Sequence, residues 1–454
     1  MNFLESLRGA RVLLFGAGVT GKPSEDFLRN RGAEVLVLDE REKNDGVRNS
    51  IEGLALADFD FALVSPGWKP NHPWLEAVRS VGVSLVSEID LAWRVKSEIA
   101  PHQRWIGLTG TNGKTTTVQM AEAMALAAGI KARACGNVGT TVIEAVTSPE
   151  ADLLILELSS FQLEWSHEFK LDSAAILNIA PDHIDWHGSF ENYAAAKFKI
   201  CNRSEVLIFN GSDSEILSRA REAQIRTVPF SLDTPANHEI GLVENLVIDR
   251  AFVSGDAEVL FELGDLNPAA PHNVLNAMAA AALIRSLGTS PEPIATALRS
   301  FKLDHHRLEL VAESDGVRWI DDSKATNPHA AIAALQSQLS AIWIAGGLAK
   351  GADMDELVQR VGSRIKAAIL IGSDADVIDQ ALAKFAPEIR REKIDSALKG
   401  GELMREVVAR AKTLAAEGDT VLLAPACASM DQFKNYAERG DLFAAAVREV
   451  LHVN

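Results

Sequence analysis

Short apolar segments alternate with longer amphipathic segments along most of the chain. This rhythm is typical of βαβ units, in which helices connect and cover parallel strands. It predicts an α/β fold with mainly parallel sheets. The predicted strands are Arg11–Phe15, Glu34–Leu38, Phe61–Val64, Ser84–Val86, Trp105–Thr109, Leu153–Glu157, Ala174–Asn178, Val206–Phe209, Val317–Ile320, Ala341–Ala345, Ala367–Ile371 and Val421–Leu423.

The chain length of 454 residues suggests three domains, because a domain usually holds roughly 100–200 residues. We place them at 1–100, 101–300 and 301–454. The first is predicted to be Rossmann-like, and the second to be a P-loop-type domain with a mostly parallel sheet. Short antiparallel strands are expected around 240–265, followed by a helix at Asn273–Leu287. The third domain is again predicted to be Rossmann-like α/β.

Composition excludes several classes of protein. The formal net charge of −17 argues against a nucleic-acid surface, which favours basic patches. The three cysteines are widely spaced, so a disulfide framework or a zinc site is not expected. The sequence has no long uncharged apolar run and no signal-peptide pattern, so we expect a cytoplasmic protein without membrane insertion.

A glycine-rich turn follows the predicted strand Trp105–Thr109 and reads Gly110-Thr111-Asn112-Gly113-Lys114-Thr115-Thr116-Thr117. It is a P-loop variant rather than the strict form, because Leu108 stands where that form has its first glycine. Backbone amides of such a loop wrap phosphates, its lysine reaches the terminal phosphates, and its hydroxyl ligates Mg²⁺. An ordinary glycine-rich βα turn is the alternative, which Lys114 and Thr115 at the helix start disfavour.

A second glycine-rich turn, Gly16-x-Gly18-x-x-Gly21, follows the first predicted strand, and Asp39 ends the next one. This pattern predicts a Rossmann-like turn, whose helix N-terminus suits an anion. The pattern alone leaves NAD, a UDP group or no ligand open.

Polar residues also follow the central strands. Glu157 ends a buried strand beside the P-loop, where it can hold Mg²⁺ directly or through water. Asp182 and His183 follow the next strand and can serve a second cation or the substrate. His183 and His187 have the spacing of a zinc helix, but the glutamate of that motif is absent, so zinc is not expected. Lys197, by itself, reads as a solvated helix lysine.

Three polar turns follow strands of the third domain. They are Asp321–Asn327, Gly346–Asp353 and Ser429–Phe433, and His306-Arg307 precedes a further strand. Asp322, Ser323 and Ser429 are also good helix-capping residue types. Because three such turns occur in one domain, they favour a substrate-binding face.

Together these motifs resemble the Mur ligases, along the whole chain. The resemblance further includes Gly136-Asn137-Val-Gly139, Ser159-Ser160-Phe161-Gln162, Tyr193–Lys197, Pro271-His272-Asn273 and Arg439-Gly440. The Ser159–Gln162 and Ser429–Phe433 segments are typical of the members that add D-glutamate. The sequence departs from the family at Asp321, where asparagine is usual, and at Tyr436, where phenylalanine is expected.

The resemblance implies that ATP phosphorylates the carboxylate of UDP-N-acetylmuramoyl-L-alanine, and that the amine of D-glutamate attacks the acyl phosphate. This reaction belongs to peptidoglycan precursor synthesis. The resemblance also assigns UDP-substrate binding to the first domain, ATPase activity to the second and amino-acid binding to the third. We expect a monomer that uses ATP and Mg²⁺, the metal at two sites.

The resemblance also assigns roles to individual residues. The implied catalytic residues are Lys114, Glu157, His183 and Lys197. The implied ATP-binding residues are Gly110, Thr111, Asn112, Gly113, Lys114, Thr115, Thr116, Asn273, Arg307 and Asp322. The implied UDP-substrate contacts are Gly18, Thr20, Asp39, Arg41, Ser65, Gly67, Asn137, Ser159 and His183. The implied glutamate contacts are Thr326, Lys324, Lys350, Ser429 and Tyr436. The implied metal ligands are Thr115, Glu157, His183 and a carbamylated Lys197.

Three other interpretations remain open at this point. A folate or cyanophycin ligase belongs to the same superfamily. A dehydrogenase would use NAD at Gly16–Gly21 and would leave the Gly110–Thr117 loop without a role. A nucleotide-dependent switch without chemistry would lack the second substrate site that the third domain offers.

Overall fold

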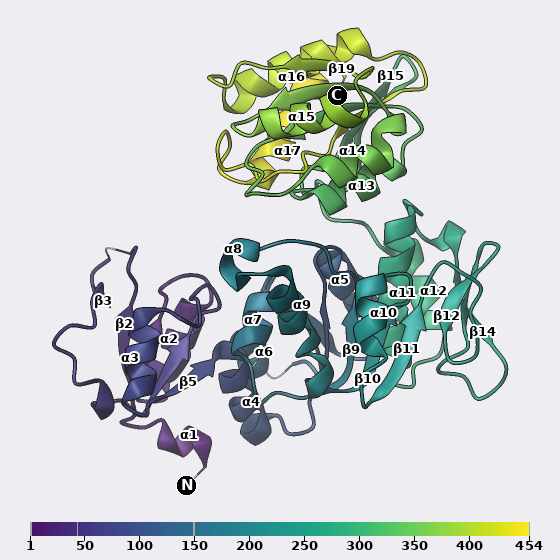
Figure 1. The fold of residues 1–454 in the computed structure, drawn as a ribbon. Helices are drawn as coiled ribbons and strands as arrows, with labels where there is room; N and C mark the ends of the chain where they lie inside the picture. Colours follow the sequence, from purple (N-terminus) through teal and green to yellow (C-terminus); the bar gives the residue numbers. More distant parts are fainter. Residues whose placement is uncertain (1, 43, 149, 454) are drawn as a thin grey trace. The chain divides into compact units, whose positions relative to one another are not determined.

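The computed structural model describes residues 2–42, 44–148 and 150–453 and contains three sheets (Figure 1). The chain divides into two compact units. One comprises the residues up to 269 together with 273–301, and the other comprises 270–272 and the residues from 302 onward. The first unit carries two of the sheets, and the second unit carries the third.

The N-terminal sheet has the strand order β3-β2-β1-β4-β5, and all its pairings are parallel. Its strands are β1 (Arg11–Phe15), β2 (Glu34–Leu38), β3 (Val47–Arg48), β4 (Phe61–Val64) and β5 (Ser84–Ser87). The helices are α1 (Phe3–Ser6), α2 (Gly21–Asn30), α3 (Pro73–Ser80) and α4 (Glu88–Ile99). The order reverses between β1 and β4, which is where open α/β sheets bind ligands.

The central sheet has the order β14-β13-β12-β11-β10-β9-β6-β8-β7. Its strands are β6 (Arg104–Thr109), β7 (Ala132–Gly136), β8 (Leu153–Glu157), β9 (Leu171–Ile176), β10 (Ser204–Asn210), β11 (Arg226–Phe230), β12 (Ile240–Val243), β13 (Leu246–Asp249) and β14 (Glu258–Glu262). The helices are α5 (Lys114–Ala127), α6 (Val142–Thr147), α7 (Ser160–Trp165), α8 (Ile184–His187), α9 (Phe190–Phe198), α10 (Ser214–Ala220), α11 (Pro271–Arg285) and α12 (Glu292–Ser300). Only β12-β13 and β13-β14 pair antiparallel among the pairings of its described strands, as predicted for 240–265.

The sheet of the second unit has the order β15-β16-β20-β17-β18-β19. Its strands are β15 (Glu309–Ser314), β16 (Val317–Asp321), β17 (Ala341–Gly346), β18 (Ile365–Ile371), β19 (Arg390–Lys393) and β20 (Thr420–Leu423). The helices are α13 (Pro328–Gln336), α14 (Asp355–Val361), α15 (Ala375–Phe385), α16 (Gly400–Leu414) and α17 (Tyr436–Leu451). Strand β15 is antiparallel to β16, and the other pairings are parallel. The predicted α/β fold with three sheet domains is confirmed, whereas the boundaries at 100 and 300 stay predictions.

Several predicted elements differ from the observed ones. Strand β9 begins and ends earlier than the predicted Ala174–Asn178, because the backbone of Asn178 bonds to the P-loop instead of a neighbouring strand. Short or polar strands were missed, since they lack an apolar run: β3, β7, β11, β15 and β19. His183 has a left-handed backbone and stands before the helix that contains His187, so the two do not share a zinc-type helix face. No described helix is long and apolar enough to cross a membrane.

Successive side chains of a strand point to opposite faces of the sheet, so they belong to separate apolar clusters. In β1, Val12 and Leu14 belong to one buried cluster and Leu13 and Phe15 to another. The first cluster continues into the central sheet, so the two sheets of the first unit share apolar core. Glu88 at the start of α4 is buried within this region and accepts the N–H of Ile143, in the first turn of α6, at 2.6 Å.

Glu88 makes the stability of the first unit depend on pH. Burial raises its pKa from 4.5 to about 7, although hydrogen bonds from Ile143 and Val142 oppose the shift. The protonated form is therefore favoured on folding, so its stabilising contribution is complete below pH 4.5 and is lost as pH rises through 7. Glu88→Gln should gain stability relative to the natural protein between pH 5 and 8, by up to about 3 kcal/mol. Urea unfolding of both proteins at pH 5 and at pH 8 measures the free energy of unfolding that Glu88→Gln gains. The same gain at both pH values would contradict the prediction.

Candidate active site

The carboxyl ends of four neighbouring central strands carry the predicted catalytic segments. The P-loop follows β6, Asn137 follows β7, Glu157 ends β8, and Asn178 to His183 follow β9. Because these strands are parallel and adjacent, their loops emerge at one edge of the sheet. The predicted position of Glu157 beside the P-loop agrees with this strand order.

The P-loop backbone requires glycine at position 113. Gly113 has a φ of +83°, a left-handed conformation that costs a residue with a side chain free energy. A Cβ atom there would lie 2.4 Å from Oδ1 of Asn276 in α11. Any side chain would therefore both strain this turn and displace a buried residue.

Asn178 fixes the P-loop from the neighbouring strand. Its side-chain oxygen accepts the N–H of Asn112 at 2.8 Å, and its side-chain amide donates to the Asn112 carbonyl at 3.0 Å. Its own carbonyl accepts the N–H of Thr111 at 2.9 Å. Asn178 is not among the site residues predicted from the sequence. The available signal was its position, as an asparagine at the end of a predicted strand.

Thr111 and Tyr193 form a second support beneath the loop. The Thr111 hydroxyl and the Tyr193 hydroxyl are 2.9 Å apart, and the Thr111 hydroxyl also bonds to the backbone of Ala180. Burial raises the pKa of the Tyr193 phenol, which keeps it a neutral donor and acceptor. Helix α9 is thereby tied to the phosphate loop.

Two lysines approach the same carbonyl of the loop. Lys114 donates to the Gly110 carbonyl at 2.8 Å and to the Thr111 carbonyl at 2.9 Å. Lys197 donates to the Gly110 carbonyl at 2.7 Å, and its ammonium nitrogen lies 4.6 Å from the centre of the Tyr193 ring. The interpretation of Lys197 as a solvated helix lysine is wrong, since only 2% of it is exposed.

The environment of Lys197 favours its neutral amine. Burial lowers its pKa well below the ordinary value, and the positive charge of Lys114 lowers it further, against the opposing effects of Asp182 and Glu157. A neutral, buried amine is a nucleophile, whereas an ammonium is not.

Glu157 is buried with one oxygen committed and the other without a hydrogen-bond partner. Its Oε1 accepts the side-chain amide of Asn137 at 2.9 Å. Its Oε2 is fully buried and has no partner among the described residues. Because a buried carboxylate oxygen without a partner costs free energy, this atom fits a cation ligand such as Mg²⁺.

Other predicted residues of this edge have structural partners. Ser159 is the N-cap of α7 and bonds to Gln162. His183 is exposed and lies beside Asp182, with its ring 4.8 Å from that of Phe161.

His187 is buried and bonds to the Ser160 hydroxyl at 2.9 Å, and burial lowers its pKa to about 4. His187 is therefore a neutral structural residue. Asn273 is buried in α11 and donates to the Pro268 carbonyl.

The first glycine-rich turn has the close packing of a Rossmann-type turn. A Cβ atom at Gly21 would lie 1.9 Å from the Gly16 carbonyl, so helix α2 packs directly on the end of β1. Asp39, after β2, accepts the N–H groups of Ala17 and Arg41 at 3.1 and 2.9 Å. The predicted UDP contacts of this region follow the carboxyl ends of β1, β2 and β4, beside the reversal of strand order: Gly18, Thr20, Asp39, Arg41, Ser65 and Gly67.

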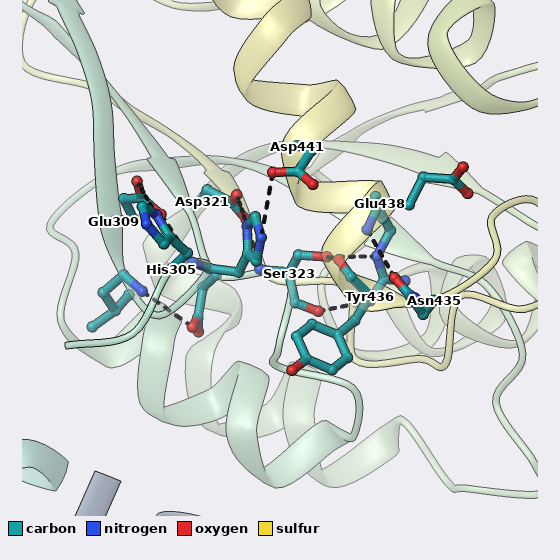
Figure 2. Close-up of polar contacts among 12 residues, drawn as sticks. His305, Glu309, Asp321, Ser323, Asn435, Tyr436, Glu438 and Asp441 are labelled. Carbon is teal, nitrogen blue, oxygen red and sulfur yellow. Dashed lines mark hydrogen bonds and ion pairs between the residues drawn. The ribbon is translucent and has the colours of Figure 1, made fainter. Parts of the chain in front are cut away.

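The second unit gathers its polar turns at the ends of β16, β17 and β20. Figure 2 shows that Ser323 lies against Tyr436, whose carbonyl accepts the Ser323 hydroxyl at 2.7 Å. The fully buried guanidinium of Arg439 donates to Ser323 and to the Cys427 carbonyl. The turns after β16 and β20 are thus joined through one arginine.

Asp321, which departs from the family, has a specific partner. One of its oxygens lies 2.7 Å from Nδ1 of buried His306, and the other accepts the N–H of Ser323 at 2.8 Å. This hydrogen bond raises the pKa of His306. An asparagine would offer a neutral acceptor, whereas the negative charge of Asp321 favours the protonated form of His306.

The predicted glutamate contacts lie on these turns. Lys350 is exposed, with a left-handed backbone, and Ser429 is buried. The Lys324 ammonium nitrogen lies 5.1 Å from the centre of the Tyr436 ring. Thr326 stands just before Asn327, the residue that caps α13. Asp322 and Ser323, although good capping residue types, do not cap this helix.

Asp322 and Arg307, the predicted ATP contacts of this unit, lie near each other. Asp322 accepts the N–H of Leu308 at 3.2 Å. Burial raises the pKa of Asp322 to about 7, while that hydrogen bond and the charge of Arg307 oppose the shift.

Residues 108–284 match the family model described as the Mur ligase middle domain, and residues 306–427 match the Mur ligase, glutamate ligase domain. The chain is 46% identical to the UDP-N-acetylmuramoylalanine--D-glutamate ligase of Thermobifida fusca, over 97% of this chain and 99% of that protein. It is 45% identical to the enzyme of that name from Streptomyces coelicolor, over 97% and 98%.

A solved structure with a similar fold is the MurF ligase from Thermotoga maritima in complex with ADP. Its TM-score is 0.59 at 15% identity, and the match covers 100% of this chain and 97% of that one. This likeness supports the fold.

Asn178→Ala should weaken nucleotide binding by about tenfold or more, because it removes two hydrogen bonds that shape the P-loop backbone. Calorimetry with ATP measures the effect. Asn210→Ala is a matched control, since Asn210 ends β10 at the same sheet edge and bonds locally to Ser212. Equal ATP affinity in the two variants would show that Asn178 does not position the loop.

Proposed function

Because the chain belongs to the Mur ligase family, we propose that it joins D-glutamate to UDP-N-acetylmuramoyl-L-alanine at the expense of ATP. The reaction is a step of peptidoglycan precursor synthesis. The observation that carries this proposal is 46% identity, over nearly the full length of both chains, with a D-glutamate ligase. The match covers all three sheets, so no second substrate site has to be supplied by another protein. The cytoplasmic location and the monomeric state stay predictions.

The chemistry requires two anions to meet. ATP transfers its terminal phosphoryl group to the substrate carboxylate, which gives an acyl phosphate and ADP. The neutral amine of D-glutamate then attacks the carbonyl carbon, forms the amide and releases phosphate. Lys114 at the P-loop supplies positive charge where negative charge accumulates on the transferred group. The loop amides of Gly110–Thr116 are proposed to hold the ATP phosphates.

The carboxyl edge of the central sheet fits Mg²⁺. The unpartnered Oε2 of Glu157 and the hydroxyl of Thr115 are oxygen donors of the kind that Mg²⁺ prefers. A carbamate on Lys197 and the side chain of His183 are the proposed donors for a second ion. Bound Mg²⁺ would neutralise charge on the phosphates. Asn137 orients Glu157 through its side-chain amide, which leaves Oε2 directed elsewhere.

The substrate sites are proposed from the family resemblance and the strand-end positions. The end of β1 would hold the UDP moiety, because helix α2 presents its N-terminus there. Asp39 already accepts three backbone N–H groups, so a uracil contact would use its remaining lone pair. The turns after β16, β17 and β20 would hold glutamate, with Lys350 facing a carboxylate. Asn273, Arg307 and Asp322 would contact ATP.

Phosphate release tests this function. It is expected only when ATP, UDP-N-acetylmuramoyl-L-alanine and D-glutamate are all present, and L-glutamate should be a poor replacement. Lys114→Ala should lower kcat by about 10²-fold or more, because it removes a preorganised charge. Lys131→Ala, at an exposed position before β7, is the control. Release that does not depend on the amino acid, or that is equal with both enantiomers, would refute the assignment.

Lys197 is predicted to carry a carbamate. Its neutral amine would add to CO₂ and lose a proton, which places a negative charge beside Lys114. NMR with ¹³CO₂ should show a carbamate signal that disappears in Lys197→Ala. Lys199→Ala is the matched control, because Lys199 is two residues later and pairs with Glu164 at 2.7 Å. A signal that persists in Lys197→Ala would contradict the prediction.

A further inference from the structure

A cavity lies at the opposite end of the central sheet from the P-loop. Its volume is about 420 Å³, and Trp105, near the start of β6, lines it. Strand β6 ends at Thr109 beside the P-loop. At about 3.3 Å per residue the two places are separated by roughly 15 Å along this strand, so the cavity is not part of the candidate active site.

One wall of the cavity contains a buried cation. Lys96 in α4 is 8% exposed, and its ammonium donates to the Pro101 carbonyl at 3.1 Å. The ammonium nitrogen also lies 4.9 Å from the centre of the Trp93 ring, which lines the same cavity. No carboxylate among the described residues forms an ion pair with Lys96. An ammonium has three N–H donors, so two remain for a ligand.

A second cation faces the cavity without a partner. Arg203 lies at the end of the 3-10 turn Cys201–Arg203, which follows the helix of Lys197. Its Nε is fully buried without a hydrogen-bond partner among the described residues, so a ligand in the cavity does not reach this atom. Its guanidinium also forms no ion pair with a described residue, and its two terminal nitrogens are the donors left for an anion. Lys170 adds a third, exposed cation on the rim.

Two carboxylates also line the cavity. Asp172 forms an ion pair with Arg104, and its charge also raises the pKa of Lys96 against the larger, lowering effect of burial. Glu205 is exposed, where water screens its charge. The lining therefore has an excess of cations, with Lys96, Lys170 and Arg203 against Asp172 and Glu205, within a protein whose net charge is −17.

We propose that this cavity is an oxyanion-binding site. Lys96 and Arg203 hold a phosphate or carboxylate group, and the Trp93 ring contacts the organic part attached to it. The chemical class of the ligand is a small phosphorylated or carboxylated metabolite. The site does not depend on the ligase reaction, because none of its residues contacts a substrate in the function proposed above.

Calorimetry on the full chain tests the site, with phosphate and succinate as separate probes at low salt. Lys114→Ala serves as the background, so that phosphate bound at the P-loop is reduced. Arg203→Gln and Lys96→Met should each weaken binding about tenfold, because each removes a charge-assisted hydrogen bond. Arg221→Gln, an exposed arginine outside the cavity, should leave the affinity unchanged. The probe that binds identifies the anionic group.

Two results of the calorimetry would overturn the proposal. One is the absence of binding by both phosphate and succinate, and the other is an affinity that Arg203→Gln leaves unchanged. Circular dichroism checks that each variant folds. Should Lys96→Met unfold, Arg203→Gln decides alone, since the Arg203 side chain has no hydrogen bond or ion pair to a described residue that the substitution would remove.

Discussion

Two lysine side chains converge on one backbone carbonyl, that of Gly110. Lys114 reaches it from the helix that the P-loop opens, and Lys197 reaches it from α9, 87 positions later in the sequence. Burial lowers the pKa of Lys197, and the positive charge of Lys114 lowers it further. This contact joins α9 to the phosphate loop and favours the neutral amine of a residue proposed to hold metal.

The P-loop depends on side chains that lie outside its own sequence. Asn178 pairs with the Asn112 backbone, Tyr193 supports Thr111, and Asn276 closes the space beside Gly113. Each comes from a different element. Because the loop glycines provide no packing of their own, these neighbours supply the rigidity that positions the amides for phosphate.

The second unit is organised by buried charge in a comparable way. Arg439 joins the turns after β16 and β20 through Ser323 and the Cys427 carbonyl, and Asp321 raises the pKa of His306 beside them. Removing a hydrogen-bond partner of a buried charged group is destabilising, so these contacts hold the turns in one arrangement. At the other end of the central sheet, no carboxylate of the described residues forms an ion pair with Lys96 or Arg203.

The sequence by itself determined the α/β fold, the glycine turns and the family. Apolar strands and the Gly110–Thr117 spacing are local patterns that hold in any context. Short strands such as β3 and β7 were not predicted from the sequence, because they carry no apolar run. Only the tertiary structure revealed that Lys197 is buried and that Asn178 clamps the loop. Both facts come from parallel strand order, which brings segments distant in sequence to one edge and sets how much water each side chain keeps.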